Sequence, residues 1–434
     1  MAPKTVLITG CSSGIGLALA VRLARDKQRR FRVIATMRNV GRSGALAAAA
    51  GPALGRTLEI KQLDVCDEGS IRACLDSIPG RHVDILVSNA GVGMAGPLEC
   101  QSLAAMQSLM DTNFFGLVRL VKEVLPDMKR RRAGHIVVIS SIMGLQGIVF
   151  NDIYSASKFA VEGFCESLVV QALRFNVAIS LVEPGPVMTE FETKLYEEAE
   201  RADYSRTDPE TAEIFTKLYL RNSRDVFTSL GQTPEDIAEH TLRVIEAARP
   251  PFRHQTNVAY TPMAALKHAD PSGALITDAF YKLVFKYDAV LRFGLRAIRL
   301  LRWKAQKLSA DKNLSVTTPT ESFCKPLKEF GSRKEKAEGF WIKPIPARGQ
   351  ISIGRRRGIR CPQPRALSVS PSPRNLPVAA GGKILQCLSR AQAGKEVKGK
   401  EKKDPLTFFS FFFFFFVSVS QACPALAAEG VRGE

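Results

Sequence analysis

The sequence predicts an α/β fold in which helices cover both faces of a doubly wound parallel sheet. Short apolar runs alternate with amphipathic helical patterns over residues 1–260. The runs at 5–9, 83–87 and 177–182 are almost continuously apolar, as expected of strands buried on both faces. Polar or glycine-rich segments follow them, and parallel sheets bind their ligands beyond the carboxyl ends of the strands. We therefore expect a single Rossmann-type domain.

Composition separates this domain from the rest of the chain. Residues 261–307 keep helical apolar patterns, so we expect a C-terminal helical extension. Residues 308–434 are rich in Lys, Arg, Pro, Ser and Gly without sustained periodicity, which predicts a disordered tail. The segment 305–434 holds 23 Lys and Arg against 10 Asp and Glu, so it carries 13 of the 19 net positive charges. A basic tail leaves nucleic-acid binding as an alternative function, but it has no motif for it.

Cysteine and histidine usage indicates a reducing compartment. The nine cysteines form no C-x-x-C pair, and the five histidines are isolated in the sequence. The amino terminus leads from Met1 directly into an apolar strand, without the pattern of a secretory signal. We expect a protein that is not secreted and that binds no metal.

A glycine-rich turn follows the first predicted strand, Thr5–Thr9, and a helical pattern begins at its end. Glycines allow the backbone to approach a pyrophosphate, and the helix N-terminus offers free N–H groups and a positive dipole end. The sequence therefore predicts phosphate contacts of a dinucleotide at Gly10, Ser12, Ser13, Gly14, Ile15 and Gly16.

Arg38 indicates which dinucleotide is preferred. It follows the second predicted strand, 31–36, where an NAD-specific site carries an acidic residue for the ribose 2'-hydroxyl. An arginine at this point can pair with a 2'-phosphate. We expect NADP(H), with a solvated loop arginine as the alternative.

Three further strands end in segments that we expect to meet the cofactor. The third, 58–65, ends with a carboxylate that can reach the adenine amino group. The fourth, 83–87, and the sixth, 177–182, lead into Ser88-Asn89-Ala90-Gly91 and Glu183-Pro184-Gly185-Pro186-Val187-Met188-Thr189. The carboxyl ends of parallel strands lie at one edge of the sheet. The predicted contacts are Asp64, Val65, Asn89, Ala90, Gly91, Pro184, Gly185, Val187 and Thr189.

Tyr154 and Lys158 lie one turn apart on a predicted helix, 154–175, and suit proton transfer. A tyrosine titrates near pH ~10 in its unperturbed state, and an ammonium one turn away is expected to lower this pKa. Ser141 follows the fifth predicted strand, 135–140, and we expect its hydroxyl beside the phenol. By itself, Y-x-x-x-K is more often a surface tyrosine with a salt-bridging lysine, so the prediction depends on the other motifs.

Asn113 is a polar residue in an apolar part of the predicted helix 103–128. A buried amide needs hydrogen-bond partners. Two interpretations remain open, namely a satisfied core amide and a side chain that holds a water or the ribose side of the site.

Two segments outside the strands bear on the substrate. Residues 190–230 combine charges with aromatic and aliphatic positions, and we expect them to form a lid over an apolar pocket. Residues 288–307 are apolar and basic, a pattern typical of a helix in an anionic membrane interface. A docking helix with a solvated basic stripe is the alternative.

As a set, these motifs resemble the short-chain dehydrogenase/reductase family over residues 4–260. The resemblance rests on Gly10-x-x-x-Gly14-x-Gly16, Asn89-Ala90-Gly91, Asn113, Ser141, Tyr154-x-x-x-Lys158 and Pro184-Gly185. Within the family, the sequence is similar to the branch that acts on retinoids and estrogenic steroids. Two features depart from the pattern: Ser88 replaces the usual first Asn of Asn-Asn-Ala-Gly, and 288–307 has no cysteine for lipid anchoring.

The resemblance implies an NADP(H)-dependent enzyme with Ser141, Tyr154, Lys158 and Asn113 as catalytic residues and Ser141 and Tyr154 against the substrate. The implied reaction is the reversible reduction of all-trans-retinal to all-trans-retinol, a step of the visual cycle. Reduction of a 17-ketosteroid such as estrone is the alternative, and an NADPH-binding pseudoenzyme is the alternative of another class. The resemblance also implies a homodimer, no nucleic-acid partner, and peripheral membrane association on the cytoplasmic side, as in the photoreceptor outer segment.

Overall fold

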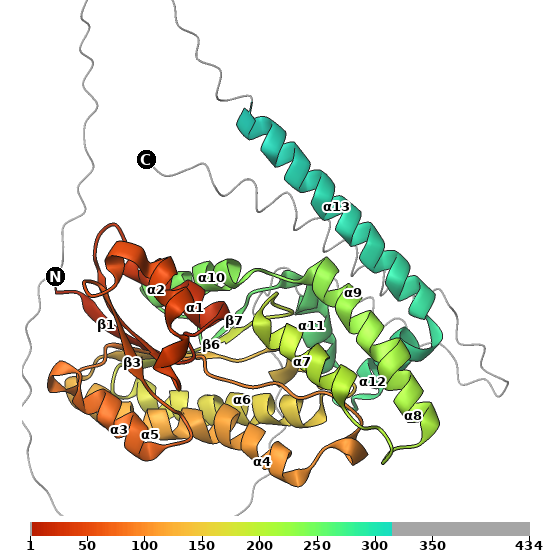
Figure 1. Ribbon diagram of the computed structural model, residues 1–434, viewed down its shortest axis with the longest axis horizontal. Helices are drawn as coiled ribbons and strands as arrows, with labels where there is room; N and C mark the ends of the chain where they lie inside the picture. Colours follow the sequence, from red (N-terminus) through yellow and green to blue (C-terminus); the bar gives the residue numbers. More distant parts are fainter. Residues whose placement is uncertain (1, 315–434) are drawn as a thin grey trace, which may run out of the picture. The chain divides into compact units, whose positions relative to one another are not determined.

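A seven-stranded parallel sheet forms the centre of the molecule in the computed structural model, which describes residues 2–314, with side chains to residue 304 (Figure 1). Its strand order is β3-β2-β1-β4-β5-β6-β7. The strands are β1 Lys4–Ile8, β2 Phe31–Met37, β3 Leu58–Gln62, β4 Ile85–Ser88, β5 Gly134–Ile139, β6 Val177–Glu183 and β7 Arg253–Gln255. Every pairing is parallel, so the predicted doubly wound sheet is confirmed.

Helices cover both faces of the sheet, which explains the continuous apolar runs (Figure 1). One layer contains α1 Gly14–Ala24, α2 Gly44–Ala50 and α10 Pro234–Glu246, and the other contains α3 Glu68–Asp76, α5 Gly116–Arg131 and α6 Asp152–Leu173. In β1, Val6 and Ile8 pack in the core under α1 and α10, whereas Leu7 packs on the opposite side with α3 and α5. Since successive side chains of a strand alternate between faces, both faces need apolar residues.

The expected helix 103–128 is interrupted. It consists of α4 Leu103–Met110, a π-helical turn η5 Asp111–Phe115, and α5. Asn113 lies in this turn and is buried. A π turn inserts one residue into the helical ladder, and such turns are frequent at functional sites.

Residues 258–260 are apolar but form no strand. These residues form a 3-10 turn, η8 Val258–Tyr260, and the edge strand is instead β7. β7 carries the polar sequence Arg-His-Gln, which lacks the apolar alternation of a strand. Its backbone pairs with β6, with Leu181 opposite Arg253, and its arginine reaches buried carboxylates. Further 3-10 turns are η1 Val40–Arg42, η2 Gly51–Ala53, η3 Pro79–Arg81, η4 Leu98–Cys100 and η6 Ile142–Gly144.

The segments after β6 are helical. Residues of the expected lid form α7 Glu190–Arg201, α8 Pro209–Glu213, the π turn η7 Ile214–Tyr219 and α9 Leu220–Leu230. The extension forms α11 Thr261–Ala269, α12 Ala274–Tyr281, the π turn η9 Lys282–Lys286 and α13 Asp288–Leu314. Leu295 and Ile298 of α13 are buried with Leu230 of α9. The helix thus continues past residue 308, where the tail was expected to begin, and the rest of the predicted tail lies outside the described residues.

Candidate active site

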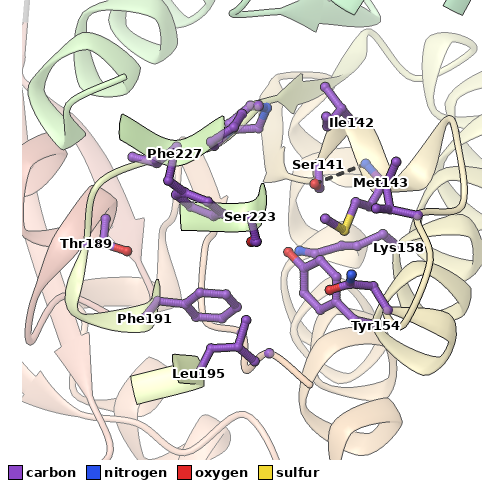
Figure 2. Close-up of a pocket in the computed structure, with 18 of the residues that line it drawn as sticks. Ser141, Ile142, Met143, Tyr154, Lys158, Thr189, Phe191, Leu195, Ser223 and Phe227 are labelled. Atoms are coloured by element: carbon purple, nitrogen blue, oxygen red, sulfur yellow. Dashed lines mark hydrogen bonds between the residues drawn. The ribbon is translucent and has the colours of Figure 1, made fainter. Parts of the chain in front are cut away.

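A cavity of about 740 Å³ lies beyond the carboxyl ends of the central strands (Figure 2). Most of the residues that the sequence predicts for the site are in its wall: Gly10, Ser12, Ser13, Gly14, Ile15, Arg38, Val65, Asn89, Ala90, Gly91, Ser141, Tyr154, Lys158, Pro184, Gly185, Val187 and Thr189. Three are not part of the wall, namely Gly16, Asp64 and Asn113. The strand ends therefore bring together side chains that are up to 179 positions apart in the sequence, from Gly10 to Thr189.

The glycine turn between β1 and α1 requires its glycines. Gly10 and Gly14 have φ angles of 72° and 58°, in the left-handed region that favours glycine. A Cβ on Gly16 would lie 2.3 Å from the Gly10 carbonyl oxygen and 2.5 Å from Asn89 Nδ2. Ser13 stands at the N-cap of α1, yet its side chain caps no N–H group of the helix. The turn thus leaves a hydroxyl and the helix N-terminus available to an anion.

Thr9 and Asn89 fix this turn to the segment after β4. Asn89 Nδ2 donates hydrogen bonds to the carbonyl oxygens of Thr9 and Gly10, at 2.9 and 3.2 Å. Thr9 Oγ1 accepts hydrogen bonds from the backbone N–H groups of Asn89 and Ala90, both at 3.0 Å. Sequence analysis missed Thr9. The sequence signal that could have identified it is a polar residue at the end of an otherwise apolar strand.

Arg38 and Asp64 differ in their relation to the cavity. Arg38 follows β2, is exposed in the cavity wall, and has no hydrogen-bond or ion-pair partner within residues 2–304. Asp64 Oδ1 instead accepts a hydrogen bond from the Cys66 N–H at 3.0 Å. The neighbouring Val65 supplies the wall at this point.

Tyr154, Lys158 and Ser141 share one side of the cavity (Figure 2). Tyr154 and Lys158 project from α6 in the same direction, with Lys158 Nζ 5.7 Å from the centre of the tyrosine ring. Lys158 Nζ also donates a hydrogen bond to the Ile139 carbonyl oxygen at 3.1 Å. Ser141 follows β5, and its Oγ accepts a hydrogen bond from the Met143 N–H at 3.1 Å. Hydroxyl and ammonium groups therefore converge on the same space.

Burial has the largest effect on the pKa values of Tyr154 and Lys158. Loss of solvent raises the pKa of Tyr154 to about 12, and a hydrogen bond with Ser141 opposes this only in part. Burial lowers the pKa of Lys158 to about 8, opposed by the charge of Glu162. The expectation that Lys158 lowers the pKa of Tyr154 is wrong for this structure, because desolvation dominates. The phenol keeps its proton at neutral pH, as a general acid requires.

Asn113 connects the segment after β4 to the helix that carries Tyr154. Its Oδ1 accepts a hydrogen bond from the Val92 N–H at 2.8 Å. Its Nδ2 donates to the Val92 carbonyl oxygen at 2.9 Å and to Ser157 Oγ at 3.1 Å. Ser157 in turn donates to the Tyr154 carbonyl oxygen at 2.7 Å. The side chain is a satisfied amide, and Ser157 is a supporting residue that sequence analysis missed.

The other half of the cavity is mainly apolar, although Lys194 and Glu198 of α7 also line it. Phe191 of α7 faces Tyr154, with the ring centres 6.1 Å apart (Figure 2). Further wall residues come from α9, α12, η9 and α13: Val226, Phe227, Leu230, Ile276, Ala279, Phe280, Leu283, Val284, Leu291, Gly294, Leu295 and Ile298. The arrangement can hold a long apolar molecule with one polar end at Ser141 and Tyr154.

Residues 2–304, whose side chains the structure describes, contain no group of three or more His, Cys, Asp or Glu side chains placed to hold a metal ion. Within the same part of the chain, every helix is too short or too polar to cross a lipid bilayer.

Comparison with known proteins identifies the family. The model of the short chain dehydrogenase family matches residues 4–200. Retinol dehydrogenase 8 from Bos taurus is 59% identical, over 68% of this chain and 95% of that protein. Human 17-beta-hydroxysteroid dehydrogenase type 1 is 45% identical, over 66% of this chain and 87% of that protein.

Solved structures agree on the fold. The crystal structure of a short-chain dehydrogenase from Streptomyces avermitilis has a TM-score of 0.51 and 27% identity, over 63% of this chain and 96% of that one. The sheet order, the glycine turn and the Ser141, Tyr154 and Lys158 side chains in one cavity agree with this match. The chain belongs to the short-chain dehydrogenase/reductase family and is an oxidoreductase.

Proposed function

We propose that the protein reduces all-trans-retinal to all-trans-retinol with NADPH. The observation that carries this proposal is the apolar wall opposite Tyr154, which offers no charged side chain on α12, η9 or α13. Relatives named retinol dehydrogenase 8, at 59% and 58% identity in Bos taurus and Homo sapiens, support the same substrate.

The residues around the glycine turn fit an NADP(H) molecule. Gly10 and Gly14 line the cavity with left-handed backbone conformations, and Ser13 leaves its hydroxyl free at a helix N-terminus. Arg38 is an exposed cation without a partner among residues 2–304, at the end of β2 where the adenosine ribose binds in doubly wound folds. It would pair with the 2'-phosphate. When bound, NADPH supplies the hydride for the carbonyl carbon.

Ser141 and Tyr154 act on the carbonyl oxygen. Their hydroxyl groups would donate hydrogen bonds to it and stabilise the negative charge that develops during reduction. Tyr154 then transfers its proton to the alkoxide, which its raised pKa of about 12 permits because the phenol is protonated at neutral pH. Lys158 holds the nicotinamide ribose and offsets the charge of the resulting phenolate. The reverse reaction, oxidation of the alcohol, uses the same groups in the opposite sense.

Asn113 would contribute to the reaction by holding neighbouring residues in position. It holds Val92 and, through Ser157, the backbone of Tyr154. We propose that the π turn around it helps to place a water that returns a proton to the site, as the family resemblance implies.

Steroid reduction is the second candidate function, and human 17-beta-hydroxysteroid dehydrogenase type 1 at 45% identity favours it. Estrone differs from retinal in that it has a phenolic hydroxyl at the end remote from its ketone. Two polar residues of α9 in this half of the cavity are already engaged. Asn222 Nδ2 donates to Asp288 Oδ1 at 2.9 Å, and Ser223 Oγ hydrogen-bonds to the Tyr196 hydroxyl at 2.8 Å. The apolar wall formed by α12, η9 and α13 therefore favours a polyene with an apolar far end.

We also propose that the protein binds peripherally to anionic membranes. The outer surface of the extension exposes large apolar side chains, at Leu275, Tyr281, Phe285, Phe293, Leu300 and Leu301. Exposed basic residues of α13, Arg296, Arg299 and Lys304, accompany them. Apolar contact combined with basic charge is what an amphipathic helix uses at an anionic lipid surface. A photoreceptor location remains a prediction from the family resemblance.

Exposed apolar residues on α4 and α6 support the expected homodimer. Leu103, Val170 and Leu173 are largely exposed among the described residues. Analytical ultracentrifugation of the full chain tests this proposal, since a second copy is the partner that would cover them.

The substrate is tested by steady-state oxidation of NADPH by the full chain in detergent, with all-trans-retinal and estrone in separate reactions. We expect a clear kcat/KM advantage for retinal. An advantage for estrone would contradict the proposed substrate and favour the steroid function. No turnover with either, in a protein that binds NADPH, would favour the pseudoenzyme.

A further inference from the structure

A buried carboxylate, Glu162, lies one helical turn after Lys158 on α6 and is 4% exposed. It accepts a hydrogen bond from the Ser140 hydroxyl. It also accepts a hydrogen bond from Arg253 Nη1 of β7, at 2.5 Å. A buried carboxylate needs such partners, because burial without them is costly. No step of the reaction described above uses Glu162.

Arg253 joins this carboxylate to the rest of the sheet. The same Nη1 donates to Glu183 Oε1 of β6 at 2.6 Å, and Nη2 donates to Glu166 Oε1 at 2.5 Å. Glu183 is fully buried, whereas the Glu166 side chain is 56% exposed. The guanidinium therefore links α6, β6 and β7 and fixes the position of the Glu162 side chain.

α6 holds two consecutive residues at the end of β5, directly before Ser141. Lys158 Nζ donates a hydrogen bond to the Ile139 carbonyl oxygen at 3.1 Å. Glu162 accepts a hydrogen bond from the hydroxyl of the next residue, Ser140. The residue after that, Ser141, lies in the cavity wall. Two contacts from one helix thus set the direction of the backbone that delivers the Ser141 hydroxyl.

We propose, on the basis of the proposed carbonyl reduction, that Glu162 is a positioning residue for the Ser141 and Lys158 pair. It acts through its hydrogen bond with Ser140 and through its negative charge beside Lys158, and Arg253 holds it in place.

The charges around Glu162 are few. The titratable groups that face it are Lys158 and the neutral thiol of Cys165 from α6, Glu183 from β6 and Arg253 from β7, and Glu166 of α6 shares this arginine with it. The other elements packed on α6, which are η6, α4 and η5, contribute no charged group to it, and Ser140, the residue after β5, donates its hydroxyl to it.

These charges determine in which direction the pKa of Lys158 changes when Glu162 loses its charge. Burial lowers the pKa of Lys158, and the Glu162 carboxylate opposes this. Removal of the Glu162 charge therefore lowers the pKa of Lys158 further, and the ammonium is lost at a lower pH.

Glu162→Gln tests the proposal, with Glu166→Gln as the matched control because Glu166 binds the same arginine but contacts neither Ser140 nor Lys158. The dissociation constant for NADPH is measured by fluorescence from pH 6 to 10, together with kcat for retinal. In wild type, both affinity and kcat should decline as Lys158 deprotonates near pH 8. We expect the alkaline midpoint to move down by about one pH unit in Glu162→Gln, and to stay in place in Glu166→Gln.

Identical midpoints in the two variants would overturn the proposal. If Glu162→Gln does not fold, Ser140→Ala provides the test, because it removes the hydrogen bond and keeps the charge. We then expect kcat to fall several-fold without a shift of the midpoint, and an unchanged kcat would overturn the positioning role. The NADPH measurement needs no substrate, so inactivity toward retinal would contradict the proposed function without affecting this result.

Discussion

Tyr154 is half-buried in the cavity wall and keeps its proton at neutral pH because desolvation raises its pKa. The sequence predicts the opposite shift, since a lysine one turn away favours a phenolate. In the structure Lys158 donates to the Ile139 carbonyl oxygen, and burial raises the pKa of Tyr154 to about 12. Motif spacing identified both residues, but the balance of desolvation and charge depends on packing that spacing does not contain.

Tyr154→Phe removes the hydroxyl and keeps the ring against Phe191. We expect kcat for retinal to fall by about 10²-fold to 10⁴-fold, because the alkoxide loses its proton donor. The dissociation constant for NADPH, measured by fluorescence titration, should change little. Retention of a tenth of the wild-type kcat would rule out Tyr154 as the acid.

Arg38→Asp replaces the cation at the end of β2 with a group that can accept hydrogen bonds from a ribose diol. We expect the ratio of kcat/KM for NADPH to that for NADH to fall by about 10-fold to 100-fold, because a charged hydrogen bond is lost and a repulsion is gained. Arg56→Asp, in the exposed turn before β3, is the matched control. An unchanged ratio in Arg38→Asp would show that another residue selects the cofactor.

Among the elements, the glycine turn is the one that the sequence describes best. Its glycines follow an apolar strand and precede a helix, so spacing alone predicts the element and its position. The bonds that hold it, between Thr9 and Asn89, join residues 80 positions apart. Short-range patterns do not contain such pairs, and for the same reason they did not indicate the bond between Arg253 and Glu162, across 91 positions.

Gly16→Ala tests how tightly the turn is packed. The new Cβ would lie 2.3 Å from the Gly10 carbonyl oxygen, which is backbone and cannot move aside without distorting the turn. We expect NADPH affinity to fall at least 10-fold in a fluorescence titration, with a lower Tm. Gly44→Ala in α2 is the control, because its Cβ meets no atom within 4 Å. Wild-type affinity in Gly16→Ala would mean that the turn is not the phosphate site.

At the level of the whole molecule, the sequence predicts the central strands and the location of the cavity better than it predicts the strand at the edge of the sheet. Buried parallel strands are continuously apolar and therefore visible in the sequence. β7 was missed because its three residues are polar and its place in the sheet depends on pairing with β6. Long-range packing, which a single sequence does not show, also determines how α9 and α13 close the apolar half of the cavity.

The exposed apolar and basic residues of the C-terminal extension predict that the protein binds to anionic membranes. We expect the full chain to co-sediment with vesicles that contain phosphatidylserine, and more weakly with neutral vesicles or at high salt. Phe293→Ser combined with Leu301→Ser should reduce this binding several-fold, because both side chains are exposed apolar groups on α13. Leu54→Ser, an exposed apolar site outside the extension, is the control. Equal binding by all variants would show that another surface contacts the lipid.

α12 and α13 contribute one side to the cavity wall and expose apolar residues on the other. If the outer side rests on a bilayer, a retinoid dissolved in that bilayer meets the enzyme by lateral diffusion and not from bulk water. The rate then depends on the mole fraction of retinoid in the lipid. At a constant total amount of retinal, addition of inert phospholipid dilutes the substrate in two dimensions and slows the reaction.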